Sequence, residues 1–351
     1  MAGVSEIPHV RTVVDGHAGR ITLDRPRAIN AVDLGMLQSI ADALDEWEHD
    51  PAVAVVVLDG AGERGFCAGG DVRTLYDQVV AGRADETATF FRVEYAVDAR
   101  IAEYAKPVVA LADGITMGGG IGLAGHARLR VVTERSRLAM PETRIGFTPD
   151  VGGTWLLSRA PGRLGEYLAL TGTAMDAADA IFAGLADHLV PSERRAELTA
   201  ALAVEPDPAA AVEWMAVPPP PSALAAQQPW IDDAFSADTV AEIVERLRAR
   251  PEDAASAAAR VLEELSPTAL AVTLAAVRRA RTRPDLRAVL AQEYGLVMWF
   301  ATTQPDLAEG IRAQLVDKDR SPRWQPAGIA DVTPETVASA LAYRPDPALW
   351  D

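Results

Sequence analysis

The segment from Gly114 to Gly153 constrains the fold of this chain most strongly. Its glycine cluster Gly118–Gly120 follows an apolar run, and a second glycine pair closes the segment. Glycine clusters occur where the backbone adopts a positive φ or comes close to another group. Between the two clusters lie two acids, Glu142 and Asp150. The combination predicts a site where backbone groups bind a carbonyl that is then attacked.

Short apolar runs, many of them β-branched, alternate with glycine loops and helical periodicity over the first 200 or so residues. Val53–Leu58 has the composition of a buried strand. Leu34–Trp47 carries apolar residues at helical spacing, with Asp33 placed to cap that helix. The expected order is strand, strand, helix, repeated along the chain. This order predicts an α/β fold of ββα units, with a core at residues 1–203.

The composition changes after residue 203. Residues 204–221 contain the run Pro218–Pro221, which excludes regular helix and predicts a stiff Pro-rich linker. Residues 222–351 then carry several apolar-periodic segments that are nearly free of glycine. They predict a mostly helical C-terminal region.

Charge and composition limit the partners. The formal charge of −17 over 351 residues argues against nucleic acid, which needs concentrated basic surface. No apolar run approaches the roughly 18 residues of a membrane span, so no membrane partner is expected. The single cysteine, Cys67, cannot form an intrachain disulfide, and the N-terminal MAGVSEIPHV lacks the pattern of a secretion signal. We therefore expect a cytoplasmic protein. The histidines show no metal-ligand spacing, so neither a metal nor a separate cofactor is expected.

One motif in the glycine segment suggests a dinucleotide site. Gly120–Gly125 matches G-x-G-x-x-G, and Glu142 lies about 20 residues further on. However, Gly114–Met117 separate the preceding strand from these glycines, and the last glycines fall inside the expected helix. The acid also follows a proline rather than ending a strand. These features argue against a nicotinamide cofactor.

The same glycines can act through their N–H groups. Gly118–Gly120 at a helix N-terminus presents free donors. A similar pair, Gly69-Gly70, also follows a buried strand and precedes a helix. Two such loops on neighbouring strands could aim one N–H each at a single carbonyl oxygen, which would form an oxyanion hole. The alternative is that both loops are tight turns needed only for packing.

A third acid lies on the helix expected at 86–104. Phe90, Val97, Ile101 and Tyr104 form one apolar stripe, and Glu94 falls on that stripe. A carboxylate on the core face of a helix is seldom without a partner or a task. The alternative is an edge position at which Glu94 reaches water or pairs with an arginine.

Three segments resemble the enoyl-CoA hydratase/isomerase, or crotonase, superfamily. They are FCAGGD (Phe66–Asp71), GITMGGGIGL (Gly114–Leu123) and MPETRIGF (Met140–Phe147). The resemblance implies a crotonase-like spiral of ββα repeats that binds an acyl-CoA thioester. It also implies that the N–H groups of Gly70 and Gly119 form the oxyanion hole. The residues that it implies for CoA binding, in the RPRAIN loop and beside the first glycine pair, are Arg25, Arg27, Ala28, Ala68, Gly69 and Asp71.

One departure selects a branch of that superfamily. Hydratases carry a catalytic glutamate at the position of Gly122, which has no side chain. Glu94 in FFRVEY, Asp150 in TPDVGG and the segments LSPTALAVTL and EGIRAQLVDKDRSPRW resemble the 3-hydroxyisobutyryl-CoA hydrolases instead. This resemblance implies hydrolysis of a short 3-hydroxyacyl-CoA in valine breakdown. Glu142 and Asp150 are then catalytic, and Glu94 and Gly119 bind substrate with them.

Two other functions remain open from the sequence. A hydratase or isomerase could use Glu142 with Asp150, and a non-catalytic CoA-binding protein could keep the fold alone. The superfamily commonly trimerises through C-terminal helices, so a homo-oligomer is an expectation. The extended C-terminal region could instead cover that surface.

Overall fold

Two sheets organise the structure, a computed structural model that describes residues 9–350. The larger has six strands in the order β1-β2-β3-β5-β7-β9, and all neighbours are parallel except β1 and β2. The smaller has three parallel strands in the order β4-β6-β8. The strands are β1 (Val10–Asp15), β2 (Ala18–Leu23), β3 (Val55–Gly60), β4 (Gly65–Cys67), β5 (Val108–Ala112), β6 (Ile115–Met117), β7 (Leu129–Val132), β8 (Arg137–Ala139) and β9 (His188–Leu189).

Strands of the two sheets alternate along the chain. β3 leads into β4, β5 into β6 and β7 into β8, so each pair contributes one strand to each sheet. Helices α2 (Val72–Val80), α4 (Gly119–Gly125) and α5 (Gly153–Ser158) follow these pairs. The predicted ββα repeat is confirmed. Two short strands, β4 and β6, lie in segments that the sequence presents as glycine-rich loops.

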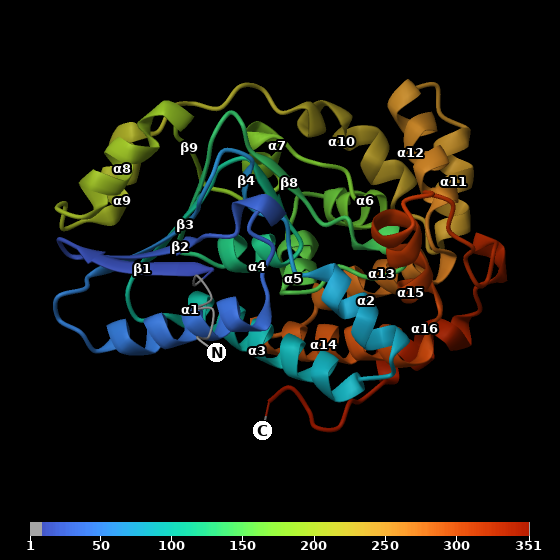
Figure 1. Cartoon of the computed structure of the whole chain (residues 1–351). Helices are drawn as coiled ribbons and strands as arrows, with labels where there is room; N and C mark the ends of the chain where they lie inside the picture. Colours follow the sequence, from blue (N-terminus) through green and yellow to red (C-terminus); the bar gives the residue numbers. More distant parts are fainter. Residues whose placement is uncertain (1–8, 351) are drawn as a thin grey trace.

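Helices lie on both faces of the larger sheet, as Figure 1 shows, while its edge strand β1 is largely exposed. Alternate residues along its strands belong to two different apolar clusters, as the two-residue period of a strand requires. One face packs on α1 (Leu34–Glu48) and α3 (Ala84–Glu103). The other packs on α8 (Arg195–Leu202) and α9 (Pro208–Met215). Asp33 caps α1 as expected, because its side chain accepts from the Met36 N–H.

The structure differs from the expected linker at residues 204–221. Part of that segment is helix α9, because Ala211, Val212 and Met215 bury their side chains against the larger sheet. Val217 then forms a bridge to Leu189 of β9. Pro218–Pro221 itself is irregular, as its composition requires. The division at 203 and 221 otherwise stays a prediction.

The C-terminal region is helical and shares the main apolar core with the ββα repeats. In Figure 1 its helices lie on the right and along the lower edge, against α5, α6 and α3. The remaining helices are α6 (Leu164–Thr171), α7 (Ala177–Phe182), α10 (Ala223–Ala234), α11 (Val240–Arg248), α12 (Asp253–Glu264), α13 (Pro267–Ala280), α14 (Leu286–Thr303), α15 (Asp306–Ile311) and α16 (Pro334–Ala342). A π-helical turn, Arg312–Val316, continues α15.

Within residues 9–350, no helix combines the length and the apolar content that a membrane crossing needs. The prediction that the N-terminal segment MAGVSEIPHV is not a secretion signal concerns mainly residues 1–8. These residues lie outside the described part of the chain.

Candidate active site

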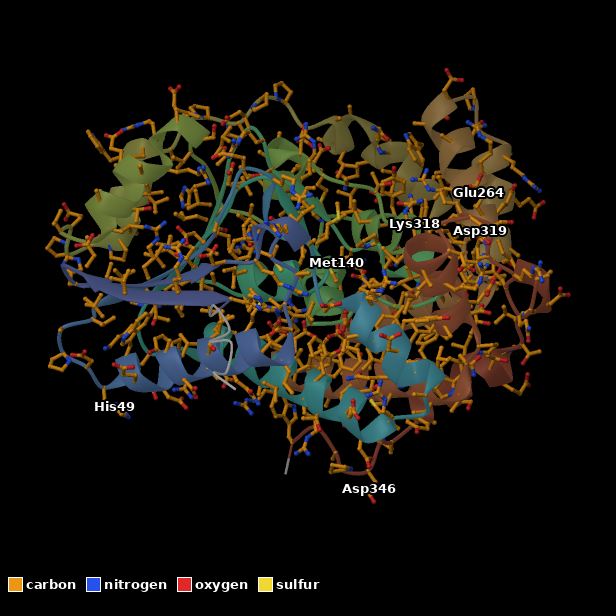
Figure 2. All side chains as sticks on the ribbon, in the orientation of Figure 1. His49, Met140, Glu264, Lys318, Asp319 and Asp346 are labelled. Carbon is orange, nitrogen blue, oxygen red and sulfur yellow. The ribbon has the colours of Figure 1, made fainter. Side chains whose placement is uncertain are left out.

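The candidate site lies at the carboxyl ends of the three short strands of the smaller sheet. Gly69-Gly70 follow β4, Gly118-Gly119 follow β6, and Glu142 follows β8. Since these strands are parallel neighbours, their carboxyl ends meet at one edge, where ligands of α/β proteins commonly bind. Figure 2 shows Met140, which directly follows β8, in the interior of the molecule.

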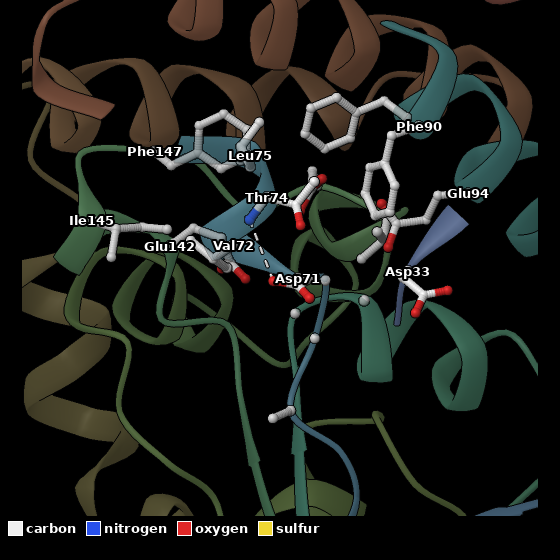
Figure 3. A pocket seen from close by; sticks show the side chains of 18 of the residues that line it. Asp33, Asp71, Val72, Thr74, Leu75, Phe90, Glu94, Glu142, Ile145 and Phe147 are labelled. Carbon is white, nitrogen blue, oxygen red and sulfur yellow. Dashed lines mark hydrogen bonds between the residues drawn. The ribbon is translucent and has the colours of Figure 1, made fainter. Parts of the chain in front are cut away.

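A cavity of about 480 Å³ opens at this edge. Apolar side chains from α2, α3 and the turn after β8 cover much of its wall, and the carboxylates of Glu94, Glu142 and Asp150 reach it from other sides. Figure 3 shows Phe90, Leu75 and Phe147 in the upper part of the view, with Glu94 and Glu142 below them. An apolar cavity with a few convergent polar groups is the usual form of a small-molecule site.

The two predicted N–H donors are brought together. A Cβ placed on Gly119 would lie 3.3 Å from the Gly70 nitrogen, so the two backbone segments touch. Neither N–H takes a protein acceptor in the described part of the chain. Free, adjacent N–H groups that line a cavity are the geometry that an oxyanion hole requires.

The acids Glu94 and Glu142 flank this pair. Oε1 of Glu94 lies 2.5 Å from the position of a Cβ on Gly119, and Oε1 of Glu142 lies 3.1 Å from that of a Cβ on Gly118. A side chain on either glycine would therefore collide with or crowd a carboxylate. Glu142 is held in a 3₁₀ turn, Glu142–Ile145, and its Oε2 is buried without a hydrogen-bond partner among the described residues.

Burial of several acids in one place changes their proton affinity. Burial, and then the charges of Asp150 and Glu142, raise the pKa of Glu94 well above its ordinary value. Burial, and then the charge of Asp150, likewise raise the pKa of Glu142. Burial raises the pKa of Asp150 to about 7. Close acids cannot all ionise at once, so the cluster holds protons at neutral pH.

The side chain of Asp150 is hydrogen-bonded to Tyr95. The Tyr95 hydroxyl donates to Oδ2 of Asp150 over 2.8 Å, and both side chains are buried. This bond favours the ionised carboxylate and opposes the effect of burial on the pKa of Asp150. Asp150 is not the cap of the helix that follows, because Gly152 occupies the N-cap of α5.

The turn that carries Asp150 is held by residues from distant parts of the chain. Val151 has a φ of 52°, which is unusual for a β-branched residue, and its carbonyl contacts Nε2 of His126 at 2.8 Å. Glu293, on α14, accepts hydrogen bonds from the N–H groups of Gly152 (2.6 Å) and Thr154 (2.9 Å). Burial raises the pKa of Glu293 to about 8. Burial lowers the pKa of His126 to about 4, so His126 is neutral here and structural.

The predicted CoA residues divide into two groups. Ala68, Gly69 and Asp71 line the cavity. Arg25 does not, because its Nη1 pairs with Asp71 at 2.9 Å, where Asp71 caps α2. Arg27 and Ala28, in the 3₁₀ turn Pro26–Ala28, do not line the cavity either. A role in CoA binding stays a prediction for all six residues.

The sequence alone does not identify several residues of the site. Asp98 lies one helical turn after Glu94, so the spacing of four could have revealed it. Tyr95 and Glu293 carry no such signal, because their roles depend on tertiary contacts. Gln314 and Leu315, from the π-helical turn after α15, also line the cavity. Cys67 is buried, which raises the pKa of its thiol to about 12 and agrees with a packing role.

Paired backbone donors and buried acids at the edge of a ββα fold define a class of proteins that polarise a carbonyl. The model of the enoyl-CoA hydratase/isomerase family matches residues 18–341. The chain belongs to this family, and the predicted crotonase-like fold is confirmed.

Relatives of known name are similar over nearly the whole chain. The mitochondrial 3-hydroxyisobutyryl-CoA hydrolase of Rattus norvegicus is 41% identical over 334 residues, which cover 92% of this chain and 86% of the relative. The corresponding protein of Homo sapiens is 40% identical over 332 residues, covering 92% and 85%.

Two solved structures are also similar. A carnitinyl-CoA dehydratase from Mycobacterium thermoresistibile is 47% identical with a TM-score of 0.93, over 97% of this chain and 98% of that one. An enoyl-CoA hydratase from Rhodobacter sphaeroides is 46% identical with a TM-score of 0.90, over 95% and 97%. These names describe water addition or removal, whereas the named relatives above are thioester hydrolases.

Proposed function

We propose that the protein hydrolyses a short 3-hydroxyacyl-CoA thioester, with 3-hydroxyisobutyryl-CoA as the substrate. The observation that carries the proposal is the arrangement of acids around the N–H pair. Position 122 is glycine, so the family's second hydratase carboxylate is missing from α4, while Glu94 and Asp150 reach the cavity from other elements. The names of the relatives agree with this substrate.

In this mechanism the thioester carbonyl oxygen accepts hydrogen bonds from Gly70 and Gly119. The two N–H groups stabilise the negative charge that develops when the carbonyl carbon is attacked. Since they are fixed before substrate binds, they need no reorganisation during the reaction. Loss of one such donor typically costs ~10²–10³ in rate.

Glu142 lies beside the N–H pair and carries the attack in one of two ways. As a nucleophile it forms an acyl–enzyme anhydride, the C–S bond breaks, and CoA leaves as a thiol after taking a proton; water then cleaves the anhydride. As a general base it takes a proton from water, which attacks the carbonyl directly. Both routes consume one water and give a carboxylic acid and CoA.

Asp150 and Glu94 hold and move protons around this centre. The pKa of Asp150, about 7, is suited to proton transfer at neutral pH. Glu94, which lies beside Gly119, would bind the substrate hydroxyl. The conversion would belong to valine breakdown. The relatives are named mitochondrial, and a cytoplasmic location of this chain stays a prediction from its sequence.

The test is a comparison of two substrates. With 3-hydroxyisobutyryl-CoA we expect rapid release of free thiol, and with crotonyl-CoA only slow hydration. Glu142→Gln should lower kcat for thiol release at least ~10²-fold with a small change in KM, because the attacking or proton-accepting carboxylate is gone. Rapid crotonyl-CoA hydration with only background thiol release would contradict the proposal.

A hydratase or dehydratase is the second candidate, favoured by the names of the two solved structures. It would use Glu142 with Asp150. A non-catalytic CoA-binding protein would show neither activity, and Glu142→Gln would leave its background unchanged.

A further inference from the structure

Asp98 is a buried carboxyl for which the proposed reaction assigns no task. It lies on α3, one turn after Glu94, and is 0% exposed. Neither of its oxygens has a hydrogen-bond partner among the described residues. A buried polar group without a partner costs free energy, so its presence needs a physical reason.

The room for this carboxyl comes from Gly122. A Cβ on Gly122 would lie 2.7 Å from Oδ1 and 2.9 Å from Oδ2 of Asp98, and 2.8 Å from Cβ of Val151. Side-chain atoms do not approach so closely. Any residue larger than glycine at position 122 would therefore displace Asp98 from its present position. The space next to α4 at position 122 is thus taken by a carboxyl from α3.

Among the residues that the structure describes, the charges that act on Asp98 are those of acids. These acids are Glu94 on the same helix, Asp150 after the 3₁₀ turn, and Glu293 on α14. The charge of Asp98 also acts on the thiol of Cys67 in β4, and α4 consists only of glycine and apolar residues. Burial, and then these three acids, raise the pKa of Asp98 well above its ordinary value. With neither a donor nor a cation, the neutral carboxylic acid is the stable form.

We propose that Asp98 is a positioning residue of the active site, a neutral carboxylic acid that fills the room over Gly122 and adds no negative charge behind Glu94. A negative charge one turn behind Glu94 would oppose the negative charge that develops on the carbonyl oxygen. A neutral acid keeps the packing without that opposing field. For its effect on turnover, the inference rests on the proposed function.

The first experiment measures the proton itself, without any substrate. In an infrared difference spectrum at pH 7, wild type minus Asp98→Asn, we expect the C=O band of a protonated carboxyl. A carboxylate signature in its place would overturn the proposal. Other buried acids common to both proteins cancel in the difference.

Thermal stability supplies a second readout independent of activity. Unfolded Asp98 ionises near pH ~3.9, whereas folded Asp98 keeps its proton to higher pH. The native state therefore binds more protons, and the stability of the wild type falls as pH rises in this interval. Asn cannot ionise, so the Tm of Asp98→Asn relative to wild type should rise between pH 5 and pH 8, by at least roughly 2–4 °C. A Tm difference that stays constant with pH would overturn the proposal.

Glu166 provides a matched control. It is equally buried, but it accepts from Arg163 (2.8 Å) and Arg281 (2.7 Å). Glu166→Gln should lower Tm across the same pH range, because it removes one side of buried ion pairs.

Turnover then tests the positioning role. At pH 7, Asp98→Asn should keep kcat within about threefold of wild type, and at alkaline pH it should stay active where the wild type declines. Asp98→Ala should lower kcat about tenfold or more with little change in KM, because Glu94 loses its support. A loss of ~10²-fold in Asp98→Asn at pH 7, or an alkaline decline of Asp98→Asn that matches that of the wild type, would overturn the proposal. If the wild type releases no thiol from any acyl-CoA, the proposed function fails, and the infrared and Tm measurements still decide the state of Asp98.

Discussion

Tyr95 and Asp150 are joined by a buried hydrogen bond of 2.8 Å that links α3 to the turn after the 3₁₀ helix. The bond ties one acid of the candidate site to the helix that carries two others, Glu94 and Asp98. A shift of this helix therefore changes the position of all three, which makes α3 the main scaffold of the acid cluster.

The pH dependence of turnover should report this bond. We expect an inflection of kcat/KM near pH 7, where Asp150 titrates. Tyr95→Phe removes a donor to the ionised form, so the pKa of Asp150 should rise. A hydrogen bond to a charged group contributes ~1.5–3 kcal/mol, which moves the inflection to higher pH by about one unit or more. Tyr104→Phe is the control, because the Tyr104 hydroxyl donates to the Leu44 carbonyl instead. An unmoved inflection in Tyr95→Phe would show that another group titrates.

The two glycines of the N–H pair should differ in their tolerance of alanine. A Cβ on Gly119 lies 2.5 Å from Oε1 of Glu94, whereas a Cβ on Gly70 meets only the ring of Phe90 at 3.4 Å. Gly119→Ala should lower kcat for thiol release by ~10²-fold, the typical effect of a displaced oxyanion donor. Gly70→Ala should lower it much less, since it keeps its N–H. Equal losses in both variants would argue against a direct role of this geometry.

Glu293 should support the site without touching substrate. Glu293→Gln has one acceptor oxygen where the carboxylate has two, so an N–H of Gly152 or Thr154 loses its partner. An unsatisfied buried donor costs ~1–3 kcal/mol, and Tm should fall accordingly. Because the turn then relaxes, kcat should fall more than KM rises. Glu103→Gln, which removes only an exposed pair with Arg287, is the control and should change neither quantity measurably.

The contact between α15 and the turn of Glu142 leaves no room for a side chain. A Cβ on Gly310 would overlap the backbone of Ile145. Gly310→Ala should therefore cost ~1–3 kcal/mol of stability, measured by urea unfolding, and lower kcat because the Glu142 turn is displaced. Gly35→Ala is the matched control, since its Cβ would come no closer than 3.4 Å to Asp33. It should be neutral or slightly stabilising in helix α1. Full activity in a stable Gly310→Ala protein would contradict the expectation.

The sequence predicts the parts of the site that local chemistry determines. The two glycine loops follow from strand-to-helix turns, and the family resemblance assigns Gly70 and Gly119 within them. The apolar stripe draws attention to Glu94. The position of Glu142 after a strand likewise follows from the motif around it. Asp98 lies one helical turn after Glu94, so the helix period could have drawn attention to it. Its proposed role, however, depends on its contact with Gly122, which belongs to a different helix.

The remaining parts depend on tertiary structure. Glu293 meets Gly152 across 141 positions of the chain, and no local pattern encodes that pairing. Helix α9 escapes prediction for a related reason. In the sequence, its short apolar segment beside several prolines resembles a linker. Only the folded structure shows that this segment packs on the second face of the larger sheet.

The pairing of Glu293 with Gly152 also has a consequence during synthesis. The ribosome delivers the turn of Asp150 long before it delivers α14, and domains generally fold from the N-terminus as they emerge. Until Glu293 arrives, the N–H groups of Gly152 and Thr154 lack their acceptor. A nascent chain stalled before α14 can therefore contain Glu94, Glu142 and Asp150 and still be inert, so that catalytic competence appears only once α14, at Leu286–Thr303 near the end of the chain, has been made.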